Sequence, residues 1–445
     1  MSQAKIVVVG GSAAGIAAAV TARRHHPDHS IRLVRKEPQV PVPCGIPYVF
    51  GTLGDVSKNL LPDAILEKNG VDLEIAEVTG IDRAKGRLIT KDGHIEYERL
   101  ILATGSVPAR PPIPGADLDG VFVVEKDVEV IRQLQSRLET AKDVVIIGGG
   151  FIGIEFADEI NKNDGKKVTV VEMAQHCLSL SYDAEFCTEM EELVQSRGIN
   201  VRTSTKVEGI EGKDRVEGVR VEGGTVIPAD VVILGVGAKA NSSLAKDADL
   251  RIGPTGGIAV DRAMRTSDPR IFACGDCAEK TSFFGGVPSQ LKLASIAQLE
   301  ARIAGANLYS LKRESEGTIG VWSTAVGPLA MGTAGLTECM AREQGYQIVC
   351  GVVEAPDRHP GAMPGMANMK VKLVFDAYSG VLLGGQVRGG PSAGEMSNAI
   401  AACVQKKMTA EDIAMFQMGT HPALTSSPIA YPLVNAAEIA ISRMR

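Results

Sequence analysis

The chain has 445 residues, of which 44% are hydrophobic and 49 are glycine, and its formal net charge at pH 7 is −6. This length predicts about three domains, and the composition is typical of buried α/β cores joined by tight turns. Charged residues form no long block of one sign, which argues against a nucleic-acid surface. No apolar run approaches the roughly 18 to 20 residues of a membrane span, and no basic, cleavable leader precedes the first expected strand, so we expect a cytoplasmic protein.

The chain is expected to begin with a strand, a glycine-rich turn and a helix. The apolar residues 6–9 lead into the string GGSAAG, which is followed by the helix-favouring residues 16–22. Glycines let the backbone approach a pyrophosphate, and a helix N-terminus offers unpaired amides and the positive end of its dipole. The next strand starts at Ile31 and carries Val34 where such a unit usually has an acid, with Glu37 as an offset substitute. The predicted dinucleotide contacts in the turn are Gly10, Ser12, Ala13, Ala14 and Gly15.

One cysteine, Cys44, stands in the string PVPCGIPY. Its flanking prolines indicate an exposed loop, which favours a reactive thiol over the small buried apolar residue that most cysteines are. The eight cysteines of the chain are irregularly spaced, unlike the disulfide framework of a small secreted domain. We therefore expect most of the others to be reduced and buried.

A second glycine turn, GGGFIG, follows an apolar strand at residues 144–147 and fits the full dinucleotide pattern. Glu172 closes the next apolar strand, 19 residues after Gly153. A carboxylate at this place can accept both hydroxyls of an adenosine ribose and would repel a 2′-phosphate, so NADH is expected in preference to NADPH. The predicted contacts are Gly148, Gly150, Phe151, Ile152, Gly153 and Glu172.

Two further apolar strands end in short polar motifs. The first covers residues 100–102 and ends in Ala-Thr-Gly, and the second covers residues 270–273 and leads into Cys274-Gly275-Asp276. An aspartate there can accept a hydrogen bond from a ribityl hydroxyl of a flavin, although it could also simply cap a helix. Cys274 and Cys277 form a CxxC pair, but the flavin motif lies within it and no second ligand pair exists, so we predict no metal site.

Taken in order, GGSAAG, ATG, GGGFIG and CGD resemble the FAD-dependent pyridine nucleotide-disulfide oxidoreductases over essentially the whole chain. The resemblance implies an α/β fold with two Rossmann-like domains, for FAD and NADH, and an α+β C-terminal dimerisation domain. It places the FAD-binding domain at residues 1–113 and 241–306, the inserted NAD(H)-binding domain at 114–240 and the dimerisation domain of a homodimer at 308–445, with strands expected at 370–375 and 381–386. Further implied cofactor contacts are Arg35, Lys36, Glu37, Pro43, Ala103, Thr104, Gly105, Gly237, Gly275 and Asp276.

The lone Cys44 resembles the single-cysteine branch of this family, whereas glutathione and lipoamide reductases carry a CxxxxC pair. That branch contains coenzyme A disulfide reductases, persulfide or polysulfide reductases, and NADH oxidases and peroxidases, and the string CGIPY is most similar to the first two. The resemblance implies that Cys44 lies over the flavin at a helix start, where the dipole favours a thiolate ready to attack sulfur. NADH would reduce the flavin, and reduced flavin would cleave a mixed disulfide or persulfide of Cys44.

Several positions depart from these relatives. Ala13 stands where the oxidases and peroxidases carry a histidine, and residues 40–43 lack the polar residues that precede the cysteine of coenzyme A disulfide reductases, so coenzyme A binding stays open. In the string THPAL, His421 resembles the acid/base histidine of the two-cysteine enzymes, with a structural role equally open, and His359 is a second candidate. Tyr431 resembles a tyrosine that relatives present to the partner's cysteine.

The sequence therefore predicts an FAD-containing, NADH-dependent homodimeric oxidoreductase that reduces a low-molecular-weight disulfide, persulfide or polysulfide through Cys44. Three alternatives remain open: an NADH oxidase that reduces oxygen, a flavoprotein reductase of a small carrier such as a rubredoxin or ferredoxin, and an NADH-binding redox sensor. In the reductase of a carrier protein Cys44 would be a spectator, and in the sensor it would only report oxidation. Neither nucleic acid nor a membrane is an expected partner.

Overall fold

The structure, a computed structural model, describes residues 5–444. The first four residues of the predicted FAD-binding domain and the last residue of the predicted dimerisation domain lie outside the described residues. Within them the chain forms two compact units, the first from residues 5–111, 122–140 and 236–318 and the second from residues 112–121, 141–235 and 319–444. Among the described residues, no helix is long and apolar enough to cross a membrane.

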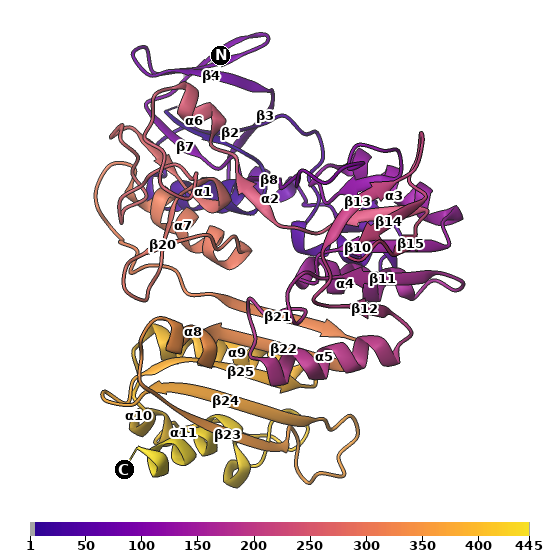
Figure 1. The fold of residues 1–445 in the computed structure, drawn as a ribbon. Coiled ribbons are helices and arrows are strands. Elements are labelled where there is room, and N and C mark those ends of the chain that lie inside the picture. Colours follow the sequence, from indigo (N-terminus) through magenta and orange to yellow (C-terminus); the bar gives the residue numbers. More distant parts are fainter. Residues whose placement is uncertain (1–4, 445) are drawn as a thin grey trace. The chain divides into compact units, whose positions relative to one another are not determined.

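The first unit is built on a parallel five-stranded sheet of order β18-β7-β1-β2-β3 (Figure 1). β1 (Ile6–Val9) is buried at every position, as expected for a strand covered on both faces. Helices α1 (Ala13–His25) and α7 (Ala294–Asn307) pack side by side on one face of this sheet. Gly305 allows their close approach, because a Cβ atom there would lie 2.6 Å from the carbonyl oxygen of Ala18.

Smaller elements complete the first unit, among them a three-stranded antiparallel sheet, β4-β5-β6, and the pairs β17-β8 and β19-β20. The remaining elements are β2 (Ile31–Arg35), η1 (Pro43–Gly45), η2 (Pro47–Phe50), η3 (Val56–Asn59), α2 (Ala64–Lys68), β3 (Asp72–Ile75), β4 (Val78–Asp82), β5 (Arg87–Thr90), β6 (Gly93–Glu96), β7 (Arg99–Leu102), β8 (Ser106–Pro108), α3 (Val128–Thr140), β17 (Ala238–Ala240), α6 (Ser243–Asp247), β18 (Ile271–Ala273), η4 (Gly275–Cys277), β19 (Lys280–Thr281) and β20 (Pro288–Ser289).

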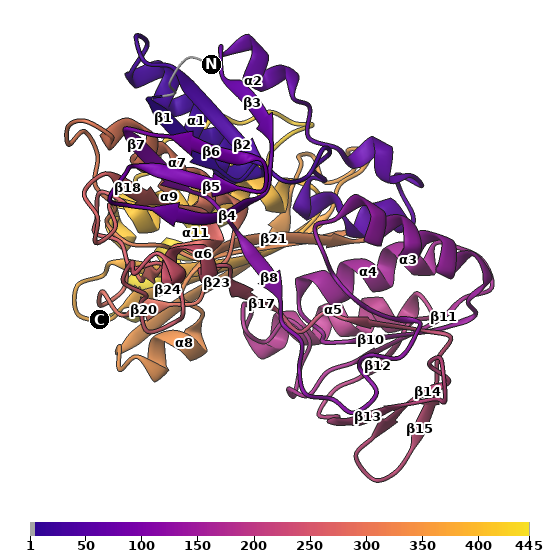
Figure 2. The same ribbon diagram turned by 90° about the horizontal axis from the view of Figure 1, so that it is seen from above.

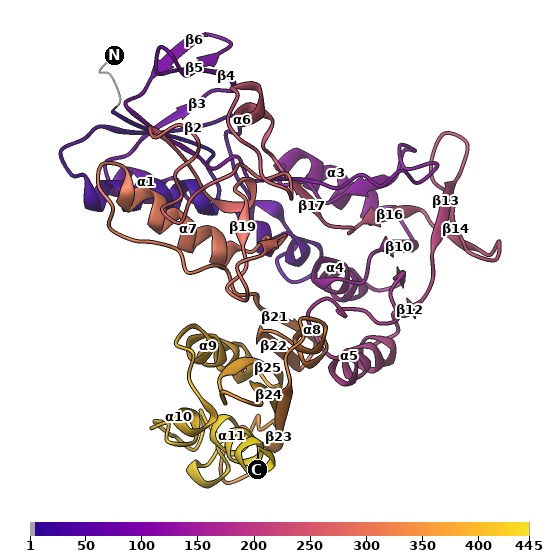
Figure 3. The same ribbon diagram turned by 60° about the vertical axis from the view of Figure 1, so that its left-hand side comes forward.

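The second unit contains a second parallel sheet, β12-β11-β10-β16, with β9 at its edge, where the two units divide. The antiparallel sheet β13-β14-β15 lies beside β10, β11 and β12 (Figure 2). A five-stranded antiparallel sheet of order β21-β22-β25-β24-β23 follows, with α9, α10 and α11 on one side and α5 on the other (Figure 3). This last sheet contains the two strands expected near the C-terminus.

β9 (Val121–Val123) begins in the second unit and continues into the first. The elements that lie wholly in the second unit are β10 (Asp143–Ile147), α4 (Phe151–Asn161), β11 (Lys167–Val171), α5 (Ala184–Ser196), β12 (Asn200–Arg202), β13 (Val207–Glu211), β14 (Gly218–Val221), β15 (Val226–Pro228), β16 (Val231–Leu234), β21 (Val321–Val326), β22 (Leu329–Gly335), α8 (Glu338–Glu343), β23 (Ile348–Pro356), β24 (Asn368–Asp376), β25 (Leu382–Gly389), α9 (Ser392–Gln405), α10 (Ala410–Ala414), η5 (Pro428–Ala430) and α11 (Pro432–Arg443).

One local expectation needs correction. The resemblance implied a helix start at Cys44, but the chain here forms two short 3₁₀ turns, η1 and η2, each with a proline at its first position. Proline lacks a backbone N–H, so Pro47 cannot continue a helix that begins at Pro43. Cys44 therefore lies in a single tight turn rather than on the first turn of an α-helix.

Candidate functional site

Three predicted motifs of the first unit lie at one edge of its parallel sheet. β1, β7 and β18 are neighbours, and Leu102 is paired in register with Val9 on one side and Ala273 on the other. The carboxyl ends of parallel strands meet at the same edge of a sheet, so the turns that follow these strands adjoin. The structure thus brings together the glycine turn, the Ala-Thr-Gly motif and the Gly-Asp motif that sequence reasoning had assigned to FAD.

The first glycine turn is held against its neighbours by contacts that only glycine permits. Gly10 has φ +114°, and a Cβ atom there would lie 2.1 Å from the carbonyl oxygen of Ala103. A Cβ atom at Gly15 would lie 1.8 Å from the carbonyl oxygen of Gly10. Ser12 is the N-cap of α1, and its hydroxyl accepts no hydrogen bond from the first amides of the helix. These amides therefore stay available to a ligand at the turn. Such a helix N-terminus suits an anionic group.

Asp276 is fixed beside this turn. Its carboxylate accepts a hydrogen bond of 2.7 Å from the Ser106 hydroxyl and lies 3.3 Å from Nζ of Lys126. Gly275, with φ +77°, brings the motif against α1, because a Cβ atom there would lie 2.7 Å from Cβ of Ala14. The carboxylate therefore has a defined position at the sheet edge, as binding to a polyhydroxyl chain requires.

The predicted contacts after β2 are placed differently from one another. The Arg35 side chain is buried, and its guanidinium is bidentate to Asp63 at 2.6 and 2.8 Å and also donates to two backbone carbonyls. The guanidinium therefore makes its hydrogen bonds within the protein, and its pair with Asp63 joins the two ends of the segment that contains Cys44. Lys36 and Glu37 lie outside the core, with Nζ and the carboxylate 3.8 Å apart. Asp63 gave no sequence signal, because the pair joins residues 28 positions apart.

Cys44 is exposed, and the turn around it is shaped by a buried asparagine. Asn59, 5% exposed, accepts a 2.8 Å hydrogen bond from the Val42 amide through its backbone oxygen, and its side-chain amide donates to the Val42 carbonyl at 3.0 Å. A Cβ atom at Gly45 would lie 1.9 Å from Oδ1 of Asn59. Asn59, which carried no sequence signal, is bonded to Val42 on one side of the cysteine and occupies the space beside Gly45 on the other.

The second glycine turn repeats the steric pattern of the first. Gly148 has φ +108°, and a Cβ atom at Gly153 would lie 1.9 Å from its carbonyl oxygen. Glu172 accepts hydrogen bonds from the amides of Gly149 at 2.6 Å and Ala174 at 2.7 Å, so the predicted ribose-binding carboxylate lies directly beside the turn. The two backbone N–H groups fix the position of the Glu172 carboxylate, as expected for a group that accepts hydrogen bonds from ribose hydroxyls.

Glu155, one helical turn after Phe151, is a candidate that sequence reasoning missed. Burial raises the pKa of its carboxyl to about 7, although a 2.9 Å hydrogen bond from the Thr324 hydroxyl opposes the rise. Trp322, the only tryptophan of the chain, lies on the same strand as Thr324 and stacks on Phe151 with 6.1 Å between ring centroids. An acidic residue inside the apolar string FIGIEFA was the available signal.

The predicted acid/base residues lie in the second unit. His421 is exposed, and its Nδ1 accepts a 3.2 Å hydrogen bond from the Ala423 amide, which leaves the ring proton of a neutral imidazole on Nε2. Ser426 stands where related two-cysteine enzymes have an orienting glutamate, but its hydroxyl donates to the carbonyl of Pro356 instead. His359 lies 3.4 Å from the Thr425 carbonyl through Nδ1. Tyr431 is half-buried, and burial raises the pKa of its hydroxyl.

Comparison with known proteins identifies the family. The family model for pyridine nucleotide-disulphide oxidoreductases matches residues 4–301, and the model for the dimerisation domain of the same family matches residues 321–429. The chain belongs to the pyridine nucleotide-disulphide oxidoreductases. It is an α/β protein with Rossmann-like sheets and a C-terminal dimerisation domain, as the sequence predicted.

Relatives match along the whole chain. A CoA-dependent NAD(P)H sulfur oxidoreductase of Pyrococcus abyssi is 34% identical, with 98% of this chain and 97% of the relative covered. An NADH oxidase of Methanocaldococcus jannaschii is 32% identical, with 99% of both covered. The solved structure of an NAD-dependent persulfide reductase from A. fulgidus superposes with a TM-score of 0.91 at 31% identity, covering 99% of this chain and 83% of that one.

Pyridine nucleotide-disulphide oxidoreductases use FAD and a nicotinamide dinucleotide, and the glycine turns of this chain fit such groups. Gly105, Gly150 and Gly237 have no protein atom within 4 Å of the position that a Cβ atom would occupy. These glycines therefore border open space, in contrast to the tightly packed Gly10 and Gly15. Glycines without side-chain or backbone neighbours on one side allow a pyrophosphate to come close to the backbone, while the tightly packed glycines keep the turn in place.

The CxxC pair of this oxidoreductase does not form a second site. Cys274 and Cys277 are completely buried, burial raises the pKa of both thiols, and no disulfide joins them. The Cys277 thiol donates to the carbonyls of Leu102 and Cys274 at 3.4 and 3.3 Å. Residues 5–444 contain no cluster of three or more side chains suited to hold a metal ion.

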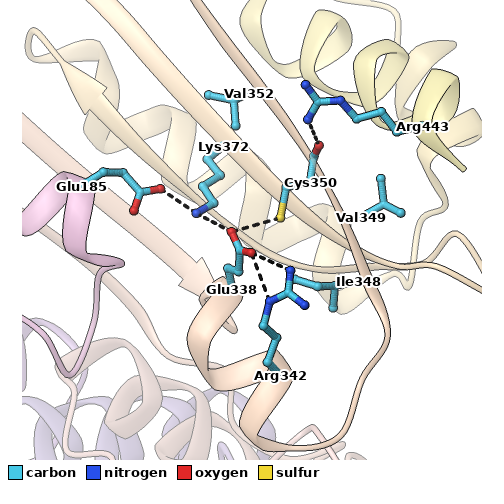
Figure 4. A pocket seen from close by; sticks show the side chains of 9 residues that line it. All are labelled: Glu185, Glu338, Arg342, Ile348, Val349, Cys350, Val352, Lys372 and Arg443. Carbon is cyan, nitrogen blue, oxygen red and sulfur yellow. Dashed lines mark hydrogen bonds and ion pairs between the residues drawn. The ribbon is translucent and has the colours of Figure 1, made fainter.

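A hollow of about 510 Å³ in the second unit has no predicted site residue in its lining (Figure 4). Lys372 is ion-paired there with Asp183, Glu185 and Glu338 at 3.0, 2.6 and 2.8 Å. The Cys350 thiol lies 3.6 Å from Glu338, and burial together with that carboxylate raises its pKa to about 12. One ammonium group thus faces three carboxylates, and the raised pKa makes the Cys350 thiol a poor nucleophile at neutral pH.

Proposed function

We propose that this protein is an FAD-dependent enzyme that uses NADH to reduce a low-molecular-weight disulfide, persulfide or polysulfide through Cys44. The observation that carries the proposal is the exposed Cys44, which lies in a short 3₁₀ turn of the unit that contains the three FAD motifs. The names of the Pyrococcus and A. fulgidus relatives, which refer to sulfur and persulfide, support the same substrate class.

The other cysteines are poor alternatives to Cys44. Burial raises the pKa of every one of these seven thiols, and a neighbouring carboxylate adds to the effect at the exposed Cys339. A protonated, buried thiol attacks a disulfide slowly and is hard for a substrate to reach. Only Cys44 combines exposure with a position in the FAD-binding unit.

The chemistry of Cys44 follows from thiol–disulfide exchange. Its thiolate would bond to one sulfur of the substrate while the S–S bond breaks and the second sulfur leaves as a thiolate. Bound FAD supplies the electron pair, taken from NADH, that cleaves the resulting bond to Cys44. The turn that Asn59 supports would hold Sγ in place. His421 is the candidate acid that protonates the leaving sulfur and Tyr431 a further polar contact, both offered across the proposed dimer to Cys44 of the partner subunit.

The remaining assignments form part of the proposal. Glu172 would accept the ribose hydroxyls and repel a 2′-phosphate, which favours NADH over NADPH. Strands β7 and β18 pair with each other although the second glycine turn lies between them in the sequence. This pairing supports an FAD-binding domain made of residues 1–113 and 241–306, with an NAD(H)-binding domain inserted at residues 114–240. Residues 308–445 would dimerise two copies, and the cytoplasmic location predicted from the sequence is retained.

The test is an anaerobic titration of the purified flavoprotein with NADH, comparing wild type with Cys44→Ser and with the matched exposed-thiol control Cys339→Ser. Each protein is first incubated with a disulfide or polysulfide and the excess is removed, so that Cys44 carries a mixed disulfide or persulfide. We then expect wild type and Cys339→Ser to take up one electron pair more than Cys44→Ser and to show a long-wavelength thiolate-to-flavin band. Identical titrations would exclude the relay through Cys44. Turnover with oxygen or with a rubredoxin or ferredoxin by Cys44→Ser would then identify the acceptor, and the M. jannaschii relative makes oxygen the first to try.

A further inference from the structure

The first unit contains an ion pair that is almost completely removed from solvent and has no part in the chemistry of Cys44. Nζ of Lys280 lies 2.9 Å from Oε2 of Glu300, and the two side chains are 4% and 2% exposed. Burial raises the pKa of Glu300 to about 7, against the attraction of Lys280. A buried pair of this kind generally adds little net stability, because desolvation offsets the Coulomb attraction. Its value must therefore lie in what it positions.

Both partners bond to the same residue of the Gly-Asp motif. Oε2 of Glu300 accepts the Gly275 N–H at 2.8 Å, and Nζ of Lys280 donates to the Gly275 carbonyl at 2.5 Å and to the Ala278 carbonyl at 2.9 Å. Gly275 has φ +77°, one of several backbone conformations that glycine adopts readily, so its hydrogen bonds are what select this one. With both of its backbone polar groups held, the peptide planes on either side of Gly275 cannot rotate freely.

The pair also ties the motif to the first glycine turn. Glu300 lies on α7, which packs on α1, and on the same helix the Gln298 side chain donates to the Ala13 carbonyl at 3.2 Å. Asp276, directly after Gly275, is thereby fixed relative to the start of α1. The two places predicted to bind the pyrophosphate and the ribityl chain of the same flavin dinucleotide are thus connected through one helix.

We propose that Lys280 and Glu300 are positioning residues for FAD, which hold the Gly275 peptide so that the Asp276 carboxylate faces the flavin ribityl chain. The inference rests on the proposed FAD site. Loss of the pair leaves the buried N–H and C=O of Gly275 without charged partners and frees Asp276 to turn away. The FAD dissociation constant should then rise by roughly 10- to 100-fold, the equivalent of one or two such hydrogen bonds.

The experiment compares wild type, Lys280→Met and the volume-matched double variant Lys280→Met/Glu300→Leu. The FAD dissociation constant is measured by flavin fluorescence during reconstitution of the apoprotein, and unfolding of the apoprotein is followed separately by circular dichroism. Lys372→Met is the matched control, since it removes a lysine of similar burial, ion-paired with Asp183 in the second unit. We expect the control to lose stability without a change in FAD affinity, and the double variant to lose FAD affinity while remaining folded.

Wild-type FAD affinity in a folded double variant would overturn the inference. If the double variant does not fold, Lys280→Met alone decides, because it keeps Glu300 as the acceptor of the Gly275 N–H and removes the donor to the Gly275 and Ala278 carbonyls. Unchanged FAD affinity in that variant overturns the inference equally. Failure of the wild-type apoprotein to bind FAD at all would instead refute the proposed function, so the two failures are distinguishable.

Discussion

Replacement of Gly45 by alanine should displace the turn that presents Cys44. The added Cβ atom would lie 1.9 Å from Oδ1 and 2.8 Å from Cγ of Asn59. Asn59 cannot swing aside without loss, because it is buried and donates to the Val42 carbonyl at 3.0 Å. Overpacking costs about 1–3 kcal/mol, and an unsatisfied buried amide costs about 1–3 kcal/mol. We expect Gly45→Ala to lower the free energy of unfolding by about 2–4 kcal/mol.

A separate effect on turnover is expected in the Gly45→Ala protein that remains folded. A displacement of a reacting atom by about 1 Å can cost about 100-fold in rate, so NADH-dependent reduction of a disulfide or polysulfide should fall by about two orders of magnitude. Urea unfolding gives the stability, and the thiolate-to-flavin absorption band reports the position of Cys44 independently of turnover. The matched control is Gly45→Ala/Asn59→Ala, in which the colliding atoms are absent.

The double variant should recover part of the turnover and of the absorption band that Gly45→Ala loses. Wild-type stability and turnover in Gly45→Ala would refute the argument from steric contact. A double variant no better than the single variant would show that Asn59 is not the group that the new methyl meets.

Three further predictions concern the second unit. The pKa of the Glu155 carboxyl is about 7, against an ordinary 4.5, so the folded state binds a proton more tightly than the unfolded state. The free energy of unfolding should therefore fall by roughly 2–3 kcal/mol as the pH rises from about 4.5 to 7. In urea titrations, Glu155→Gln should show a weaker dependence of the free energy of unfolding on pH. Glu172→Ala should raise the KM for NADH by about tenfold and weaken discrimination against NADPH in steady-state kinetics, whereas an unchanged NADH to NADPH ratio would count against a role in ribose recognition. Gly153→Ala should lower the melting temperature, because its Cβ would lie 1.9 Å from the Gly148 carbonyl oxygen. Gly150→Ala has open space for its Cβ, so it should keep the wild-type melting temperature but bind NADH more weakly in calorimetry. Normal NADH binding by Gly150→Ala would contradict the proposed approach of the pyrophosphate.

The sequence alone predicted the family, the fold class and most of the elements that carry the motifs. Local rules suffice for these features: an apolar strand, a turn of small residues and a helix follow one another within about 20 residues, and each constraint acts between near neighbours. The expected strands at 144–147 and 370–375 are parts of β10 and β24, and the helix expected at 16–22 is part of α1. The family models confirm the assignment that the order of these motifs suggested.

The tertiary structure decided which distant residues support those motifs. Asn59 beside Gly45, Asp63 on Arg35, Thr324 on Glu155 and the Lys280–Glu300 pair at Gly275 all join residues that no local pattern links. The physical reason is that a buried polar group must find its partner wherever packing brings one, and the sheet order, not sequence distance, determines which segments meet. The sequence could therefore indicate where the dinucleotides and the thiol belong, while the side chains that hold them in position could be identified only once the chain was folded.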